Sequence, residues 1–250
     1  TLFREIAASL DLPRELTPRI DQIFAGLHAL GSSPRHVATL LESAGLTPRS
    51  RVLDLACGKG ATAVCLASRI GCRVVGVDAC APFIASARDL ATNQNVGHRC
   101  AFRLGDVRHP PRGPFDAALM LGLFPISQAA LVLRRLVRKG GFYVIDDAFL
   151  DDRFRPTPPG LRSIPTRAHT REFIRALGDE VVAVDIPTPS QIDRFNRSLY
   201  RRISARARAL AHREPGLRAP IRDFLARQRR AHTLLRGPLR PATWLIRRAG

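Results

Sequence analysis

Three aspartates are the residues best placed to do chemistry in this sequence, because each ends or directly follows a hydrophobic run. They are Asp54, Asp78 and Asp106. Such runs are typical of strands in a parallel sheet, whose carboxyl ends meet at one edge where ligands bind. Asp78 follows Gly58 at the offset at which an acid holds the hydroxyls of a ribose. Asp106 is placed to accept a hydrogen bond from an exocyclic amine such as that of adenine. The three together predict a nucleoside site.

The glycines after Asp54 indicate how the rest of such a ligand is held. Gly58 and Gly60 separate the first expected strand from a helix, so bare backbone and a helix N-terminus face the ligand. The run 58–63 also fits the G-x-G-x-x-A fingerprint of dinucleotide-binding proteins, which keeps a nicotinamide enzyme as the rival interpretation. Asp54 argues against that rival. A carboxylate ahead of the loop repels a pyrophosphate but attracts an amino group and a sulfonium.

Strand and helix patterns alternate along the chain and predict the elements that position these residues. This alternation specifies an α/β fold with a doubly wound, mostly parallel sheet of seven strands. We expect strands over 51–56, 72–77, 100–104, 115–121, 142–146, 180–186 and 242–247. We expect helices over 18–30, 34–44, 61–69, 82–93, 127–138, 170–177, 191–212 and 220–236.

Five stretches of the chain resemble motifs of the class I S-adenosylmethionine-dependent methyltransferases. The run 54–60 resembles their first motif, with Ala56 where the first glycine often stands, and 74–78 resembles the second. The pair Gly105 and Asp106 resembles the third. The runs 115–120 and 136–142 resemble the fourth strand and the approach to the fifth. Together these motifs are specific, whereas the glycine loop alone is not.

This resemblance covers roughly residues 35–187 and implies a Rossmann-like fold, S-adenosylmethionine as cofactor and methyl transfer as the reaction. It further implies the residues that contact the cofactor: Asp54, Ala56, Cys57, Gly58, Gly60, Asp78, Ala79, Gly105, Asp106, Val107, Met120 and Leu121. We expect one domain, 1–250, made of N-terminal helices (1–45), a cofactor-binding core (46–187), a helical cap (188–238) and the last strand (239–250).

The stretch after the fourth strand indicates the kind of acceptor. Methylation of amino groups in DNA bases uses an Asn/Asp-Pro-Pro-aromatic element there, but residues 121–126 are apolar. Methylation at C5 of pyrimidines uses a cysteine in a Pro-Cys context, and the sequence contains no such dipeptide. A small-molecule acceptor of apolar or aromatic character is therefore favoured.

The helices over 191–236 are the expected cover of the acceptor pocket. We expect the acceptor to contact residues after the fourth strand and polar residues of the cover: Leu123, Phe124, Asn196, Tyr200, Gln228 and His232. A buried, satisfied set of polar side chains and a boundary that faces solvent are the alternatives for the polar members.

Methyl transfer is an in-line displacement that needs a general base only when the nucleophile carries a proton of high pKa. The candidates for such a base are His232, Asp147 and Tyr200. Asp146 and Asp147 lie at the edge of the site, where a turn or helix cap is the alternative. His36 could reach the carboxylate end of the cofactor. The sequence shows no cluster of metal ligands, and we expect no metal.

The net charge of +19 raises the question of a polyanionic partner. Of the 40 basic residues, 38 are arginine, and 16 of these lie in residues 190–250. This face is interpreted first as solvated, with an anionic substrate or an RNA methyltransferase as alternatives. A protein that binds the cofactor without transferring methyl groups is the third functional class.

The length and the cysteine content indicate the size of the core and the compartment of the protein. With 250 residues, 45% of them hydrophobic, the chain can bury a sizeable core. No run approaches a membrane span, and no signal-like stretch opens the sequence. The five cysteines form no C-x-x-C pair and are typical of reduced thiols, which predicts a cytoplasmic protein.

Overall fold

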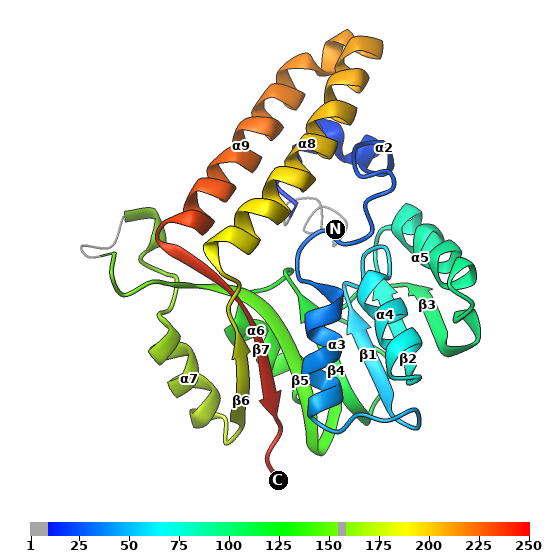
Figure 1. Cartoon of the computed structure of the whole chain (residues 1–250), viewed down its shortest axis with the longest axis vertical. Helices are drawn as coiled ribbons and strands as arrows, with labels where there is room; N and C mark the ends of the chain where they lie inside the picture. Colours follow the sequence, from blue (N-terminus) through cyan, green and yellow to red (C-terminus); the bar gives the residue numbers. More distant parts are fainter. Residues whose placement is uncertain (1–9, 155–158) are drawn as a thin grey trace.

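The computed structural model describes residues 10–154 and 159–250, and a seven-stranded sheet forms the centre of this part of the chain (Figure 1). The strand order is β3-β2-β1-β4-β5-β7-β6. Neighbours pair in parallel except β7, which runs antiparallel to both β5 and β6. The strands are β1 (Arg51–Leu55), β2 (Arg73–Asp78), β3 (Cys100–Leu104), β4 (Phe115–Leu121), β5 (Val137–Leu150), β6 (Glu180–Asp185) and β7 (Leu239–Arg247). The predicted fold class is confirmed.

Helices cover both faces of this sheet. On one face lie α3 (Pro34–Ser43), α4 (Ala61–Arg69) and α5 (Ala81–Asn93), and on the other lie α6 (Ile126–Leu133) and α7 (Arg167–Ala176) (Figure 1). Each face therefore has its own hydrophobic core, with the sheet between them.

The alternation of side chains along each strand supplies both cores. In β1, Val52 packs into the core under α3 and α4, whereas Leu53 and Leu55 pack into the core under α6. Successive strand residues point to opposite faces, so a continuous apolar run serves both. This is why the strands that position the site are hydrophobic throughout.

Two long helices project beyond the carboxyl edge of the sheet. They are α8 (Pro189–Arg213) and α9 (Arg218–Arg236), which pack against each other as a helical hairpin (Figure 1). A capping box between Thr188 and Gln191 fixes the start of α8. The hairpin lies between β6 and β7 in sequence, so the two helices precede the last strand as predicted. None of the described helices is long and apolar enough to cross a membrane.

The N-terminal elements pack on the hairpin. They are η1 (Arg14–Arg19) and α2 (Ile20–Ile23), and Phe24 meets Phe224 of α9 edge to face at a centroid distance of 6.3 Å. A third hydrophobic core lies between these elements; its fully buried members include Leu16, Ile23, Ala207 and Phe224. The hairpin is thereby joined to the start of the described chain.

The predicted helix over 18–30 is wrong in most of its length. A 3₁₀ helix and a single α-helical turn end at Ile23, and Gly26 adopts a φ of +56°. This left-handed conformation suits glycine and breaks the helix. Residues 24–33 cross the carboxyl edge of the sheet instead, and we call them the N-terminal segment.

The fifth strand is longer than predicted, and the helix before it is shorter. We expected a helix over 127–138 and a strand over 142–146, but α6 ends at Leu133 and β5 begins at Val137. The pairing of β5 with β4 shifts register at Gly140 and Gly141, where a Cβ on Gly141 would lie 2.7 Å from a backbone oxygen. Pairing with β7 extends β5 as far as Leu150.

Candidate functional site

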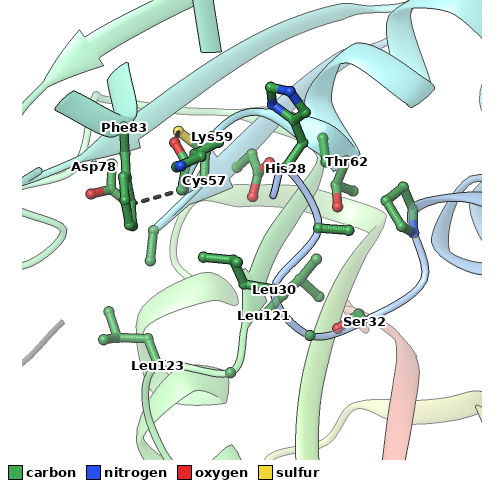
Figure 2. A pocket seen from close by; sticks show the side chains of 18 of the residues that line it. His28, Leu30, Ser32, Cys57, Lys59, Thr62, Asp78, Phe83, Leu121 and Leu123 are labelled. Carbon is green, nitrogen blue, oxygen red and sulfur yellow. Dashed lines mark hydrogen bonds between the residues drawn. The ribbon is translucent and has the colours of Figure 1, made fainter. Parts of the chain in front are cut away.

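A pocket of about 170 Å³ lies at the carboxyl ends of β1, β2 and β4. Its walls come from the glycine loop and the start of α4 (54–62), from Asp78 and Phe83, from residues 28–34, and from residues 121–123. Several of these side chains are seen together around the pocket: His28, Leu30, Ser32, Cys57, Lys59, Thr62, Asp78, Phe83, Leu121 and Leu123 (Figure 2). We call it the loop pocket.

The side chain of Asp54 lines the loop pocket and lacks a hydrogen-bond partner for one of its oxygens. Its carboxylate is buried, and Oδ2 has no hydrogen-bond partner. Burial, together with the nearby charge of Asp78, raises the pKa of Asp54 to about 7. A buried carboxylate without a partner is costly unless a ligand supplies a donor or a cation. The site is therefore complementary to a positively charged group such as an amino group.

Asp78 holds the glycine loop in place. Its Oδ2 accepts a hydrogen bond from the backbone N–H of Gly58 at 2.8 Å, drawn dashed in Figure 2, and its Oδ1 accepts one from Cys80 at 2.8 Å. Burial raises the pKa of Asp78, and these backbone donors oppose the rise. A carboxylate has further lone pairs, so Asp78 can still accept hydrogen bonds from hydroxyls of a ligand.

The loop backbone is left-handed at three positions: Ala56 (φ +58°), Gly58 (φ +54°) and Gly60 (φ +76°). A Cβ on Gly58 would meet no atom within 4 Å, so open space lies beside this residue. A Cβ on Gly60 would lie 2.8 Å from the Cβ of Ala87 in α5, so this glycine allows the helices to pack closely. The loop thus combines an open backbone for a ligand with tight packing behind it.

Lys59 and the N-terminal segment complete the loop pocket, and the sequence reasoning missed both. The Lys59 side chain is buried, its Nζ donates to the carbonyl of Phe24, and it lies 5.1 Å from the ring centroid of Phe83. Burial lowers the pKa of Lys59. The available signal was that Lys59 is one of only two lysines in a chain with 38 arginines. Lys59 joins the glycine loop to the segment that covers the pocket.

The residues predicted to bind a cofactor divide into two groups. Those that line the loop pocket are Asp54, Ala56, Cys57, Gly58, Asp78 and Leu121. Those outside its lining are Gly60, Ala79, Gly105, Asp106, Val107 and Met120, of which Val107 and Met120 are buried in the core. Asp106 forms an ion pair with Arg108 at 2.6 Å, and hydrogen bonds from Arg108 lower the pKa of Asp106 to about 2. For the second group, contact with a cofactor stays a prediction.

A larger cavity of about 640 Å³ lies beside the loop pocket, under the helical hairpin. Both are lined by Leu10, Leu30, Gly31 and Ser32, so the N-terminal segment forms a shared wall. The other walls come from both helices of the hairpin, from the carboxyl ends of β5 and β6, including Asp146 and Asp185, and from the first half of the antiparallel β7. We call it the hairpin cavity.

The structure brings four predicted acceptor contacts together in the hairpin cavity. Asn196, Tyr200, Gln228 and His232 all line it. Leu123 lines the loop pocket instead, and Phe124 lines neither. The sequence pattern therefore identified the faces of both hairpin helices that line this cavity. It did not predict that Asp146 and Asp185 would line the same cavity.

The partners of these side chains differ. Gln228 Nε2 donates to the carbonyl of Leu10 at 3.1 Å, and the hydroxyl of Tyr200 accepts from Arg229 at 3.1 Å. His232 Nε2 lies 3.3 Å from Oδ1 of Asp193. In contrast, Nδ2 of Asn196 is buried and has no partner. The first three are engaged within the protein, whereas the amide nitrogen of Asn196 has no partner.

Asp147 and His36 do not lie where the sequence predicted them. Asp147 lies outside the lining of both cavities, and its carboxylate accepts from the backbone N–H groups of Ile126 and Ala148 at 2.8 Å. This contact favours the alternative of a helix cap. His36 lines the hairpin cavity, where its Nδ1 lies 3.1 Å from Oδ2 of Asp185.

The described part of the chain contains no group of three or more histidine, cysteine or acidic side chains arranged to hold a metal ion. Its five cysteines are free thiols. Burial raises the pKa of Cys57, which borders the loop pocket, and thereby disfavours a nucleophilic thiolate. The arrangement is therefore suited to binding and positioning two molecules, one in each cavity.

Comparison with protein families finds a match between residues 52–141 and the family model described as "Methyltransferase domain". The matched region runs from the first strand through the glycine loop to the start of β5. No curated protein matches the chain in sequence.

Solved structures share the whole fold. A S-adenosylmethionine-dependent methyltransferase from Geobacter sulfurreducens, in complex with S-adenosylhomocysteine, is 21% identical with a TM-score of 0.79, over 95% of this chain and 98% of that one. Its counterpart from Thiobacillus denitrificans, in the same complex, is 20% identical with a TM-score of 0.77, over 94% and 98%. YjhP from Escherichia coli is 19% identical with a TM-score of 0.78, over 95% and 100%. At these identities the likeness establishes the fold.

Proposed function

We propose that this chain, a class I S-adenosylmethionine-dependent methyltransferase, moves the methyl group to a small molecule bound in the hairpin cavity. The observation that carries the proposal is the pair of adjoining cavities. One contains an unpartnered buried carboxylate beside a glycine loop, and the other is larger and shares the wall formed by Leu30, Gly31 and Ser32. A donor and an acceptor bound in these two spaces would lie next to each other, on either side of these residues.

The cofactor is S-adenosylmethionine, and the loop pocket offers groups that suit its amino group and its ribose. We assign its amino group to Asp54 and its ribose to Asp78, because the first is unpartnered and the second has lone pairs to spare. The open space beside Gly58 lets the ligand approach the backbone. We assign the cofactor to the core over 46–187 and the acceptor to the helical cap over 188–238.

When bound, the cofactor supplies an electrophilic methyl carbon, and the acceptor's lone pair forms the new bond as the C–S bond breaks and sulfur keeps the electron pair. The protein's task is to align the two molecules and to exclude water. Apolar side chains such as Leu121 and Leu123 on one side and Leu199 on the other suit that task.

The cofactor assignment is tested by calorimetry with S-adenosylhomocysteine and with NAD. We expect the first to bind and the second not to bind, because a pyrophosphate would lie beside Asp54. Preferential binding of NAD would refute the proposal. The acceptor class is tested by incubating a cell extract with the protein and methyl-labelled cofactor. Label in the small-molecule fraction supports the proposal, and label in RNA supports the alternative below.

An RNA methyltransferase is the second candidate, and the arginines of the hairpin favour it. Their side chains are exposed along both helices: Arg194, Arg197, Arg201, Arg208, Arg218, Arg222, Arg229 and Arg230. Neutralising Arg201, Arg208 and Arg222 would abolish salt-sensitive binding to total RNA if this candidate holds. Arg202 is a poor choice for this test, because it donates to the carbonyl of Gly26 at 2.8 Å.

A protein that binds the cofactor without transferring its methyl group is the third candidate. SpnF, a protein with this fold described as a [4+2]-cyclase, is 19% identical with a TM-score of 0.71. Its description shows that the fold also supports other chemistry. Formation of S-adenosylhomocysteine in step with a methylated product would exclude this candidate for the present chain.

A further inference from the structure

Carboxylates in this arginine-rich protein fall into two sets. Most of those that are ion-paired in the described chain pair with an arginine: Glu42, Asp106, Asp116, Asp151, Asp179, Glu180, Asp193 and Glu214. Asp54, Asp146 and Asp147 form no ion pair with an arginine of the described residues, although the net charge is +19. A carboxylate without an arginine partner can attract a cation of a ligand.

Two carboxylates without an arginine partner, Asp146 and Asp185, form the floor of the hairpin cavity. Asp146, near the end of β5, is partly buried and accepts a hydrogen bond from the hydroxyl of Ser32. Asp185, at the end of β6, has His36 as its ion-pair partner. Burial, reinforced by the charges of Asp147 and Asp185, raises the pKa of Asp146 to about 6. A cation in the cavity would relieve this repulsion.

Asp146 lies next to the residues that the two cavities share. Its partner Ser32 lines both the loop pocket and the hairpin cavity, and a Cβ on Gly31 would lie 3.9 Å from Oδ2 of Asp146. Asp146 also pairs in register with Leu121, the last residue of β4, which lines the loop pocket. A group held by Asp146 therefore lies close to the cofactor's space.

A second feature of the same cavity indicates a polar ligand. The amide of Asn196 has a buried nitrogen without a partner, and it lines this cavity. An amide can present either its NH₂ group or its oxygen, so it can meet a donor or an acceptor of a ligand. Apolar side chains, including Ile192, Leu199 and Ile203, make up about half of the lining.

We infer that the acceptor is an amine carried on an apolar body, bound as a cation by Asp146 and Asp185 and methylated on its nitrogen. This inference rests on the proposed function and names the substrate class of the same site. An ammonium ion has no free lone pair, so one proton must leave before transfer. The carboxylate of Asp146 takes that proton, and the nitrogen lone pair then forms the bond to the methyl carbon while the C–S bond breaks.

The test compares three probes of equal chain length on protein saturated with S-adenosylhomocysteine: octylamine, octan-1-ol and octanoate. Calorimetry at pH 7.5 measures binding without any transfer. We expect octylamine to bind at least about tenfold more tightly than octan-1-ol, because a partly buried carboxylate attracts the ammonium ion. We expect octanoate to bind more weakly than both.

Substitution of Asp146 and of Asp185 tests whether these two carboxylates cause the preference for the amine. Asp146→Asn and, separately, Asp185→Asn should reduce octylamine binding several-fold and leave octan-1-ol binding unchanged. Asp116→Asn is the matched control, because Asp116 pairs with Arg138 near the opposite end of β4. Two variants keep the test valid if one of them fails to fold.

Three results would overturn the inference: no binding of octylamine, equal binding of amine and alcohol, or a preference that survives both substitutions. The proposed function fails in a different way. If S-adenosylhomocysteine itself does not bind, the assignment of the cofactor is wrong. If it binds and the amine preference is absent, only the present inference is wrong.

Discussion

The loop pocket and the hairpin cavity share a wall but draw their residues from the chain in different ways. The reactive groups of the loop pocket come mostly from residues 54–83, a single strand-loop-helix-strand stretch and the turn that follows. The hairpin cavity needs the N-terminal segment, the ends of three strands and two long helices. A contiguous stretch fixes geometry through local hydrogen bonds, such as that from Gly58 to Asp78. The cavity depends on packing between distant segments, and the two regions should therefore respond differently to substitution.

The largest effect is expected from Phe224→Ala in the hairpin. Phe224 is fully buried against Phe24, so its truncation should lower the free energy of unfolding by roughly 3–5 kcal/mol. Urea unfolding measures this loss, and Leu131→Ala at an exposed position is the control. S-adenosylhomocysteine affinity should change little at temperatures where the protein is folded. An equal loss of that affinity would show that the two regions do not behave separately.

Asp78→Ala should produce the largest loss in the loop pocket. It removes the acceptor for the N–H groups of Gly58 and Cys80 and the proposed contact with the ribose, a cost of roughly 2–4 kcal/mol in cofactor binding. Calorimetry with S-adenosylhomocysteine checks this. Octylamine binding to the hairpin cavity serves as the reference for an unaffected region. Unchanged cofactor affinity would show that the ribose is placed wrongly.

Asp54 predicts a dependence of stability on pH that originates in the loop pocket. The folded protein keeps the Asp54 proton up to about pH 7, whereas the unfolded chain releases it near 3.8. Between these values the folded state binds more protons, so Asp54 makes stability fall as pH rises, by at most about 1.4 kcal/mol per pH unit. Asp54→Asn should remove this contribution from the pH profile of thermal unfolding.

Cofactor affinity should follow the opposite trend. Ionised Asp54 attracts the amino group, so S-adenosylhomocysteine should bind more tightly as pH rises through 7, and the Asp54→Asn variant should lose this increase. A native protein whose affinity is flat across this range would contradict the assignment of the amino group to Asp54.

The smallest effect is expected where the hairpin meets the start of the described chain. Gln228 donates to the carbonyl of Leu10 and to Asp11, so Gln228→Ala should cost about 0.5–1.5 kcal/mol of stability. Denaturant unfolding measures it, with exposed Gln128→Ala as the control. Loss of amine binding without loss of stability would instead make Gln228 a ligand contact.

The strand pattern was predictable because burial on both faces leaves a continuous apolar run, as in residues 115–121. The predictions failed where conformation depended on partners elsewhere. The helix over 18–30 was expected from local signals, but Gly26 and the packing of residues 24–33 over the sheet edge ended it at Ile23. The short strand over 142–146 extends to Leu150 because β7 pairs along it, which a local pattern does not contain.

Among the residues of the candidate site, too, those with local partners were predicted and those with distant partners were missed. Asp54, Gly58 and Asp78 were found because their roles follow from offsets within one stretch. Asp106 was grouped with them, yet its ion pair with Arg108 and its place outside the loop pocket were not visible in the sequence. Lys59 and Ser32 were missed, because their partners Phe24 and Asp146 lie far from them in sequence.

The sequence by itself therefore predicted the sheet and the glycine loop, since these depend on periodicity and on fixed local spacing, and the same stretch carries the groups proposed to bind the methyl donor. Only the tertiary structure showed the cavity that we propose for the second molecule. It brought Ser32, Asp146 and Asp185 to one cavity and placed Asn196 within it. Contacts between distant segments arise from the packing of whole elements, and no local spacing records them. The proposed acceptor site thus depends on the packing of the whole chain, whereas the groups proposed to bind the donor come mostly from one stretch of it.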